Sequence, residues 1–64
     1  MTGRMSLKAA RVNAGYSQED VAKQIGRGKQ TLSNWENGKT KIDAEAFMEL
    51  CRLYKTRPED IFLP

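Results

Sequence analysis

The stretch QEDVAKQIGRGKQTLSNWENG, residues 18–38, holds two short helical patterns separated by a glycine turn. Just before it, Ser17 is followed three residues later by Asp20, a variant of the capping box in which the shorter Asp replaces Glu. An apolar stripe follows at helical spacing, and Gly26 can adopt the positive φ that ends a helix with a sharp turn. This pattern predicts a helix over residues 18–25.

A second short helix is expected after the turn. Leu32 and Trp35 begin a new apolar stripe, and Asn37 with Gly38 marks its end, so the helix covers residues 29–37. Two interpretations of Trp35 compete, a stacking platform for a single-stranded base and a core residue. Its spacing from Leu32 places it on the inward face of the helix, which favours the core.

Three further helices are expected around this pair. Ser6 is a candidate cap for a helix over residues 7–13, and Asp43 precedes the strongest periodic pattern of the chain, over residues 44–54. Pro58 suits the first position of a short last helix. Because the sequence has no strand-like alternation, we predict an all-α fold with five helices.

Length and cysteine content limit the architecture. A chain of 64 residues can form one small domain, which we place over residues 6–64, with residues 1–5 as a flexible leader. The single cysteine, Cys51, excludes an internal disulfide, and its apolar neighbours favour a packing role over a redox role. Without histidine, the usual zinc-binding sets cannot form.

The charge is concentrated in the middle of the chain. The net charge is +3, but residues 23–41 contain five basic residues and one acidic residue, a local net charge of +4. Residues 43–64 contain three basic and five acidic residues, a local net charge of −2. This distribution favours an acidic partner for the middle segment.

Several classes of protein are disfavoured. An enzyme would need a nucleophile with a base, a metal or paired carboxylates, and here the acids are scattered and histidine is absent. We therefore expect no catalytic residue, no metal and no cofactor, and nothing indicates a small-molecule ligand. No apolar run approaches the roughly 20 residues of a membrane span, and the start lacks a signal peptide, so we expect a cytoplasmic protein.

One face of the second helix carries side chains suited to reading base edges. On a helical wheel its polar residues fall within an arc of roughly 140°, opposite the apolar stripe. Lys can donate to guanine, and Gln and Asn can pair bidentately with adenine in the major groove. Polar residues on an exposed helix face are often only solvated. If this face binds DNA, we predict that Lys29, Gln30 and Asn34 contact base edges, with Ser33 as a secondary contact.

Read together, eight residues resemble the Cro/cI-type (XRE-like) helix-turn-helix family of bacterial and phage repressors: Gln18, Ala22, Gly26, Leu32, Trp35, Glu36, Asn37 and Gly38. The resemblance covers about residues 7–62. It implies a compact, lambda-repressor-like domain whose helix-turn-helix, about residues 18–37, binds double-stranded DNA in the major groove. The implied function is sequence-specific transcriptional regulation, and we expect a repressor.

The resemblance also implies roles for single residues. It assigns Gln18 to the DNA backbone, and it implies a partly buried ion pair between Arg11 and Glu36. Gly28 departs from the family, in which Ser or Thr often caps the reading helix and contacts a phosphate. Further phosphate contacts are expected from the turns on either side of that helix, at Arg27, Asn37, Lys39, Thr40 and Lys41.

The assembly and the partner class stay open. The apolar run at residues 61–64, with Met48 and Leu53, is a candidate homodimer interface, and a dimer would call for a near-palindromic operator. A monomer would read one half-site, and the chain is either a short regulator or the N-terminal part of a longer repressor. The alternative function is a protein-interaction module, such as an antitoxin or anti-repressor, on the same helical scaffold.

Overall fold

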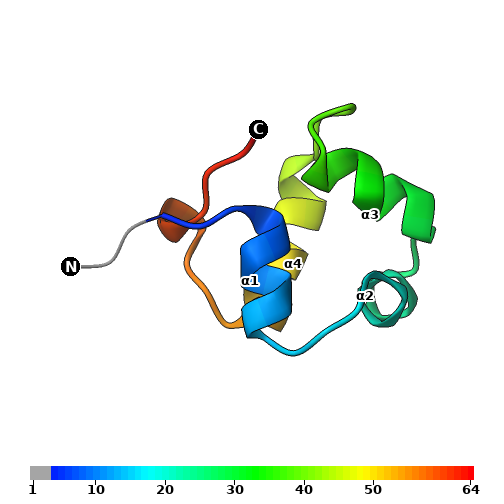
Figure 1. Ribbon diagram of the computed structural model, residues 1–64, viewed down its shortest axis with the longest axis horizontal. Helices are drawn as coiled ribbons and strands as arrows, with labels where there is room; N and C mark the ends of the chain where they lie inside the picture. The colour runs from blue at the N-terminus through cyan, green and yellow to red at the C-terminus, as the bar shows by residue number, and fades with distance from the viewer. Residues whose placement is uncertain (1–3) are drawn as a thin grey trace.

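The computed structural model describes residues 4–64, which form four α-helices and one 3-10 turn (Figure 1). The elements in order are α1 (Leu7–Asn13), α2 (Gln18–Ile25), α3 (Lys29–Glu36), α4 (Ala44–Tyr54) and the turn η1 (Pro58–Asp60). Figure 1 shows α1 in front of α4, with α2 and α3 together at the other end of the molecule. The all-α class is as predicted from the sequence.

The predicted short fifth helix begins at Pro58 as expected, but it is not confirmed as an α-helix. Pro58 opens only a single 3-10 turn of three residues. The backbone then becomes extended at Ile61, with φ −111° and ψ 133°, and this geometry buries the Ile61 side chain in the core. Extended backbone at this point also lets the segment pair with Met5, which a continuing helix could not do.

Side-chain caps fix where three of the helices begin. Ser6 Oγ accepts a hydrogen bond from the Ala9 N–H at 3.1 Å, and the Asp43 carboxylate accepts from the Ala46 N–H at 3.3 Å. At α2 both bonds of the capping box form between Ser17 and Asp20, at 3.0 and 3.2 Å. The bond from the Ser17 N–H lowers the pKa of the Asp20 carboxyl below its ordinary value.

The core lies between α1, α4 and the buried sides of α2 and α3. Leu7, Leu32 and Leu50 are completely enclosed, and Trp35 is buried among them rather than presented to solvent. Cys51 is also buried, and this burial raises the pKa of its thiol. The buried hydrophobic residues are Leu7, Ala10, Val21, Ala22, Leu32, Trp35, Ala46, Leu50, Cys51, Tyr54 and Ile61.

The segment before α1 is tied to the segment after η1. The Met5 N–H donates to the Asp60 carbonyl at 2.9 Å, and the Phe62 N–H donates to the Met5 carbonyl at 3.0 Å. The Met5 side chain is half-buried against the core. The expectation of a flexible leader over residues 1–5 therefore does not hold for Met5, whereas residues 1–3 lie outside the described part of the chain.

Two negative findings concern residues 4–64. No helix within this range is long and apolar enough to cross a membrane. No three acidic or cysteine side chains in the same range are grouped closely enough to hold a metal ion.

Candidate nucleic-acid interface

The turn between α2 and α3 sets the relative position of the two helices. Gly26 adopts φ +70° at the end of α2, and the Arg27 N–H donates back to the Ala22 carbonyl at 3.0 Å. A positive φ costs glycine little, whereas other residues pay for it. Ala22 is buried and Leu32 is completely enclosed, so the two helices pack through their apolar sides.

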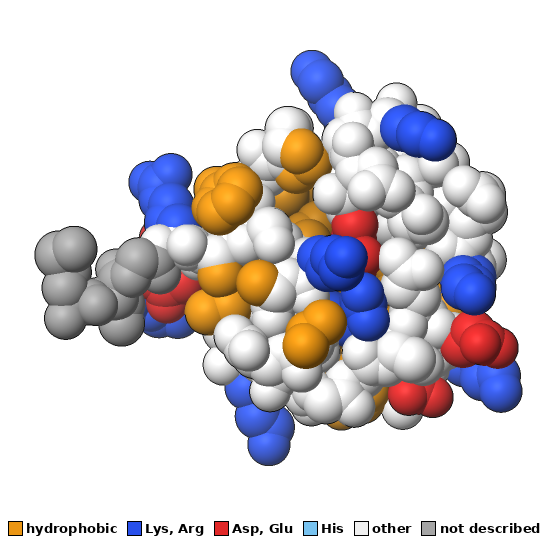
Figure 2. All heavy atoms as spheres, viewed as in Figure 1, with side chains coloured by type: hydrophobic (Ala, Val, Ile, Leu, Met, Phe, Trp, Pro, Cys, Tyr) orange, Lys and Arg blue, Asp and Glu red, His pale blue; other side chains and the backbone are white. Residues whose placement is uncertain are grey.

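The polar side chains of α3 share the face that points away from the core. Lys29 and Gln30 are exposed, and Ser33 and Asn34 are partly exposed. The structure thus brings together the four residues that the sequence analysis selected as base readers. Figure 2 shows hydrophobic side chains gathered over α1 and the C-terminal segment, while the surface over α3 is mostly polar and uncharged.

Two hydrogen bonds order this polar face. Gln30 Nε2 donates to Asn34 Oδ1 at 3.0 Å, and Asn37 Nδ2 donates to Ser33 Oγ at 3.3 Å. The two residues of each pair are four positions apart, which places their side chains on neighbouring turns of the helix. The Gln30 bond does not use the Gln30 carbonyl oxygen or the Asn34 amide nitrogen, so both remain available for a further partner.

Glu36, at the end of α3, joins three parts of the fold. Arg11 Nε donates to Glu36 Oε2 at 2.8 Å, and the ion pair is buried, with side-chain exposures of 10% for Arg11 and 2% for Glu36. Arg11 Nη1 also donates to the Tyr16 carbonyl at 2.9 Å, so a further N–H group of the buried guanidinium has a hydrogen-bond partner. The ion pair expected between α1 and α3 is present.

Gln18 completes the same cluster. Its Nε2 donates to Glu36 Oε1 at 2.9 Å, so the first residue of α2 is held against the last residue of α3. The amide nitrogen carries a second hydrogen, which this contact leaves available for an acceptor such as a phosphate oxygen. The sequence pointed to both residues but gave no sign of this contact, because they are 18 positions apart.

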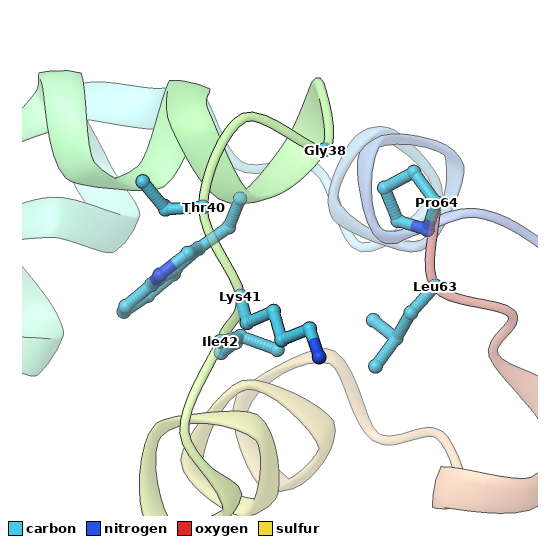
Figure 3. Close-up of a pocket in the computed structure, with 7 residues that line it drawn as sticks. Gly38, Thr40, Lys41, Ile42, Leu63 and Pro64 are labelled. Carbon is cyan, nitrogen blue, oxygen red and sulfur yellow. The ribbon is translucent and has the colours of Figure 1, made fainter.

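Four of the residues predicted to contact the DNA backbone lie in the exposed segment that begins at the end of α3. Asn37, Lys39, Thr40 and Lys41 are exposed, and the Lys39 N–H donates to the Asn34 carbonyl at 2.9 Å. A cavity of about 290 Å³ lies between this segment and the last residues of the chain. Figure 3 shows Lys41 reaching across toward Leu63, with the Pro64 ring beside Gly38.

Arg27 differs from the other residues expected to bind phosphate. Its guanidinium carbon lies 5.4 Å from the centroid of the Trp35 ring, and its Nη2 lies 3.7 Å from Asp43 Oδ1. From the sequence, Asp43 was expected only to cap a helix and Arg27 only to contact a phosphate. The available signals were the positive charge of Arg27 and its place beside α3, and both favoured a phosphate contact.

Comparison with known proteins agrees with this arrangement. The family model described as helix-turn-helix matches residues 7–61. ImmR, an HTH-type transcriptional regulator of Bacillus subtilis, is 38% identical over 48 residues, which cover 75% of this chain and 38% of ImmR. Two uncharacterized HTH-type transcriptional regulators of Archaeoglobus fulgidus are each 28% identical over 60 residues, 94% of this chain.

These relatives differ in length. The 48 matched residues span well under half of ImmR, whereas the alignments cover 86% and 84% of the two archaeal proteins. The family match itself extends from the first residue of α1 to the residue after η1. The chain therefore belongs to the Cro/cI-type (XRE-like) helix-turn-helix family.

Proposed function

We propose that this protein binds double-stranded DNA sequence-specifically, with α3 in the major groove, and acts as a transcriptional repressor. The observation that carries the proposal is the polar face of α3, whose amide and lysine side chains point outward from a buried scaffold. A helix of this kind fits the major groove, where each base pair presents a distinct pattern of donors and acceptors. The three relatives described above are named as transcriptional regulators.

Base reading falls to Lys29, Gln30 and Asn34, with Ser33 as a secondary contact. The hydrogen bond between Gln30 and Asn34 presents one acceptor, Gln30 Oε1, beside one donor group, Asn34 Nδ2. Adenine offers the complementary pair in the major groove, a donor at N6 and an acceptor at N7. We therefore expect an A·T pair near the centre of each half-site, and Lys29 suits a neighbouring guanine.

Backbone contacts come from both sides of the reading helix. Gln18 offers its second amide hydrogen at the start of α2, and Asn37, Lys39, Thr40 and Lys41 follow the end of α3. Contacts to phosphate fix the orientation of a protein on the duplex and contribute most of its salt dependence. Arg27 belongs to the same region, but its guanidinium is already in contact with Trp35 and Asp43.

We further propose that two copies bind a near-palindromic operator. Phe62 and Leu63 are each 47% exposed, and Leu63 lines the cavity beside the segment that follows α3. A two-fold dimer would place the two reading helices about 34 Å apart, one helical turn of DNA. Each half-site would then present the same bases to α3.

The decisive experiment is selection of bound sequences from a random duplex pool, with the wild-type chain beside a Gln30→Ala, Asn34→Ala double variant. A Gln24→Ala, Asn13→Ala variant is the matched control, because it removes the same two side-chain types from exposed positions off α3. We expect wild type and control to enrich one paired motif that the α3 variant loses. No enrichment by wild type would favour a protein partner instead.

A further inference from the structure

The turn before α3 contains an arginine with two structural partners. The Arg27 guanidinium lies over the Trp35 ring, 5.4 Å from its centroid, which is within the range of a cation–π contact. The same guanidinium faces Asp43, with 3.7 Å between Nη2 and Oδ1. The exposed fractions of the two charged side chains are 39% and 52%, so the pair lies at the surface but above a buried ring.

Asp43 can serve Arg27 without giving up its capping role. Its Oδ2 accepts the hydrogen bond from the Ala46 N–H that starts α4, and its Oδ1 faces the arginine. Asp43 follows the segment that leaves α3, while Arg27 precedes α3. The contact therefore connects the chain entering the reading helix to the chain leaving it.

The start of α3 lacks a side-chain cap. Its N-cap is Gly28, which supplies no side-chain hydrogen bond, and the first turn contains no acidic residue. Ser6, Ser17 and Asp43 give the other three α-helices such a bond. A helix of eight residues has marginal stability by itself, so α3 depends on contacts with the residues around it.

From these observations we propose that Arg27 is a positioning residue that fixes the start of α3 against Trp35 and Asp43, and that it is not a phosphate contact. The inference rests on the proposed function, in which α3 reads DNA. The planar guanidinium suits both partners, since it stacks on aromatic faces and pairs with carboxylates. A phosphate at this position would compete with Asp43 for the guanidinium, and Lys29 and Gln30 would lose part of that support.

A double-mutant cycle in the free protein tests the contact without DNA. Arg27→Met keeps an apolar cover over Trp35, and Asp43→Asn keeps a good N-cap for α4, so each variant removes mainly the charge. We expect the two changes to be coupled by about twofold to fivefold in the unfolding equilibrium constant. Additive effects, with unchanged emission from Trp35, the single tryptophan, would overturn the proposal.

Binding to DNA tests the role. The probes are a duplex enriched from the random pool and a random-sequence duplex, each titrated over a range of salt. Arg27→Met should keep the wild-type slope of log K against log salt, whereas Lys41→Met should reduce its magnitude by about 0.9. Arg27→Met and Asp43→Asn should each lower the affinity ratio of enriched to random duplex, by about fivefold.

The opposite pattern would identify Arg27 as a phosphate contact restrained by Asp43. In that case Arg27→Met would reduce the salt slope as Lys41→Met does, and Asp43→Asn would tighten binding by releasing the guanidinium. The outcome is separable from a failure of the proposed function. If wild type bound neither duplex, the regulator proposal would fall, whereas the cycle in the free protein would still report whether Arg27 holds α3.

Discussion

At the scale of single residues, the buried polar groups are gathered around Glu36. This carboxylate accepts from Arg11 and Gln18, so its charge is compensated although its side chain is almost fully enclosed. A buried charge without such partners would cost several kcal/mol, roughly the whole stability of a small domain. Glu36 therefore ties the scaffold of α1 to the helix pair that we propose binds DNA.

The hydroxyl of Tyr54 is the exception to this compensation. Tyr54 is 7% exposed, and within residues 4–64 its hydroxyl oxygen has no hydrogen-bond partner. The ring packs near Tyr16, with 6.4 Å between the two centroids. A buried hydroxyl without a partner loses its hydration and gains nothing in return.

We predict that Tyr54→Phe stabilises the protein. Removing the hydroxyl while keeping the ring should raise the free energy of unfolding by about 1 kcal/mol, as measured by urea denaturation. Tyr16→Phe is the matched control, because Tyr16 is only partly buried, and it should change stability by less than about 0.5 kcal/mol. A loss of stability in Tyr54→Phe would mean that the hydroxyl has a partner in solution.

The same residue predicts a decline of stability at alkaline pH. Burial, with a smaller contribution from the Glu36 charge, raises the pKa of Tyr54 above its ordinary value of 10.0. Above that pH the unfolded chain loses the phenolic proton while the folded chain keeps it. Stability from this group is therefore complete below pH 10 and decreases as the pH rises, by at most about 1.4 kcal/mol per unit.

The measurement is urea denaturation of wild type and Tyr54→Phe at about pH 8 and about pH 10.5. These two pH values lie on either side of the ordinary tyrosine pKa of 10.0, which applies to the unfolded chain. Wild type should lose more stability over this interval than the variant, which has no proton to lose at this position. Equal losses would show that Tyr54 ionises as easily in the folded chain as in the unfolded chain.

At the scale of the helices, local signals account for most of what the sequence predicted. Ser6, Ser17 and Asp43 cap their helices as expected, because a cap is a contact between residues three positions apart. The exposed polar face of α3 was also predictable, since a helical wheel needs only one helix. The type of the last helix was not predicted. Pro58 and two acidic residues favour a helix start, but pairing with the distant Met5 requires an extended chain at Ile61, so only the short η1 forms.

The N-cap of α3 is the clearest position for improvement. Gly28 has φ −78° and ψ 153°, close to the values of the two serine caps, and a Cβ added there would meet nothing within 4 Å. Gly28→Ser should raise stability by about 0.5–1 kcal/mol, through a new capping bond and a less flexible unfolded chain. The melting temperature should rise by about 4 °C.

Gly26→Ser is the control for that substitution. A Cβ there would also meet nothing within 4 Å, but φ is +70°, so the side chain would be strained by the backbone alone. The variant should lose about 1 kcal/mol in the same melting experiment. If both serines changed stability in the same direction, the two glycines would not have the distinct roles described above.

At the scale of the whole molecule, the contacts that the sequence could not reveal are those between distant residues. Met5 pairs with the chain after η1, Gln18 meets Glu36, and Arg27 meets Asp43. No local pattern marks such contacts, because they depend on how the helices are packed. These contacts hold the proposed DNA-binding residues in place. The sequence therefore predicted which residues share the exposed face of α3, but it did not predict the contacts that position this helix.

The exposed apolar side chains of Phe62 and Leu63 lead to a prediction about assembly. Phe62 is 47% exposed, so Phe62→Ser should lower the melting temperature by about 4–8 °C, while a dimer built on this part of the surface would be weakened. Sedimentation of the chain on a duplex with two half-sites should then show one bound copy where wild type shows two. Affinity for a single half-site should stay within about twofold of wild type, because Phe62 lies outside α3.

Val12→Ser provides the comparison, since Val12 is 57% exposed on α1, away from residues 62 and 63 in the sequence. Removing an exposed apolar side chain there should change neither the number of bound copies nor the affinity. If Val12→Ser disrupted paired binding and Phe62→Ser did not, the dimer would use the α1 face. If neither did, the chain would bind its two half-sites independently, and the near-palindromic operator would reflect two separate binding events.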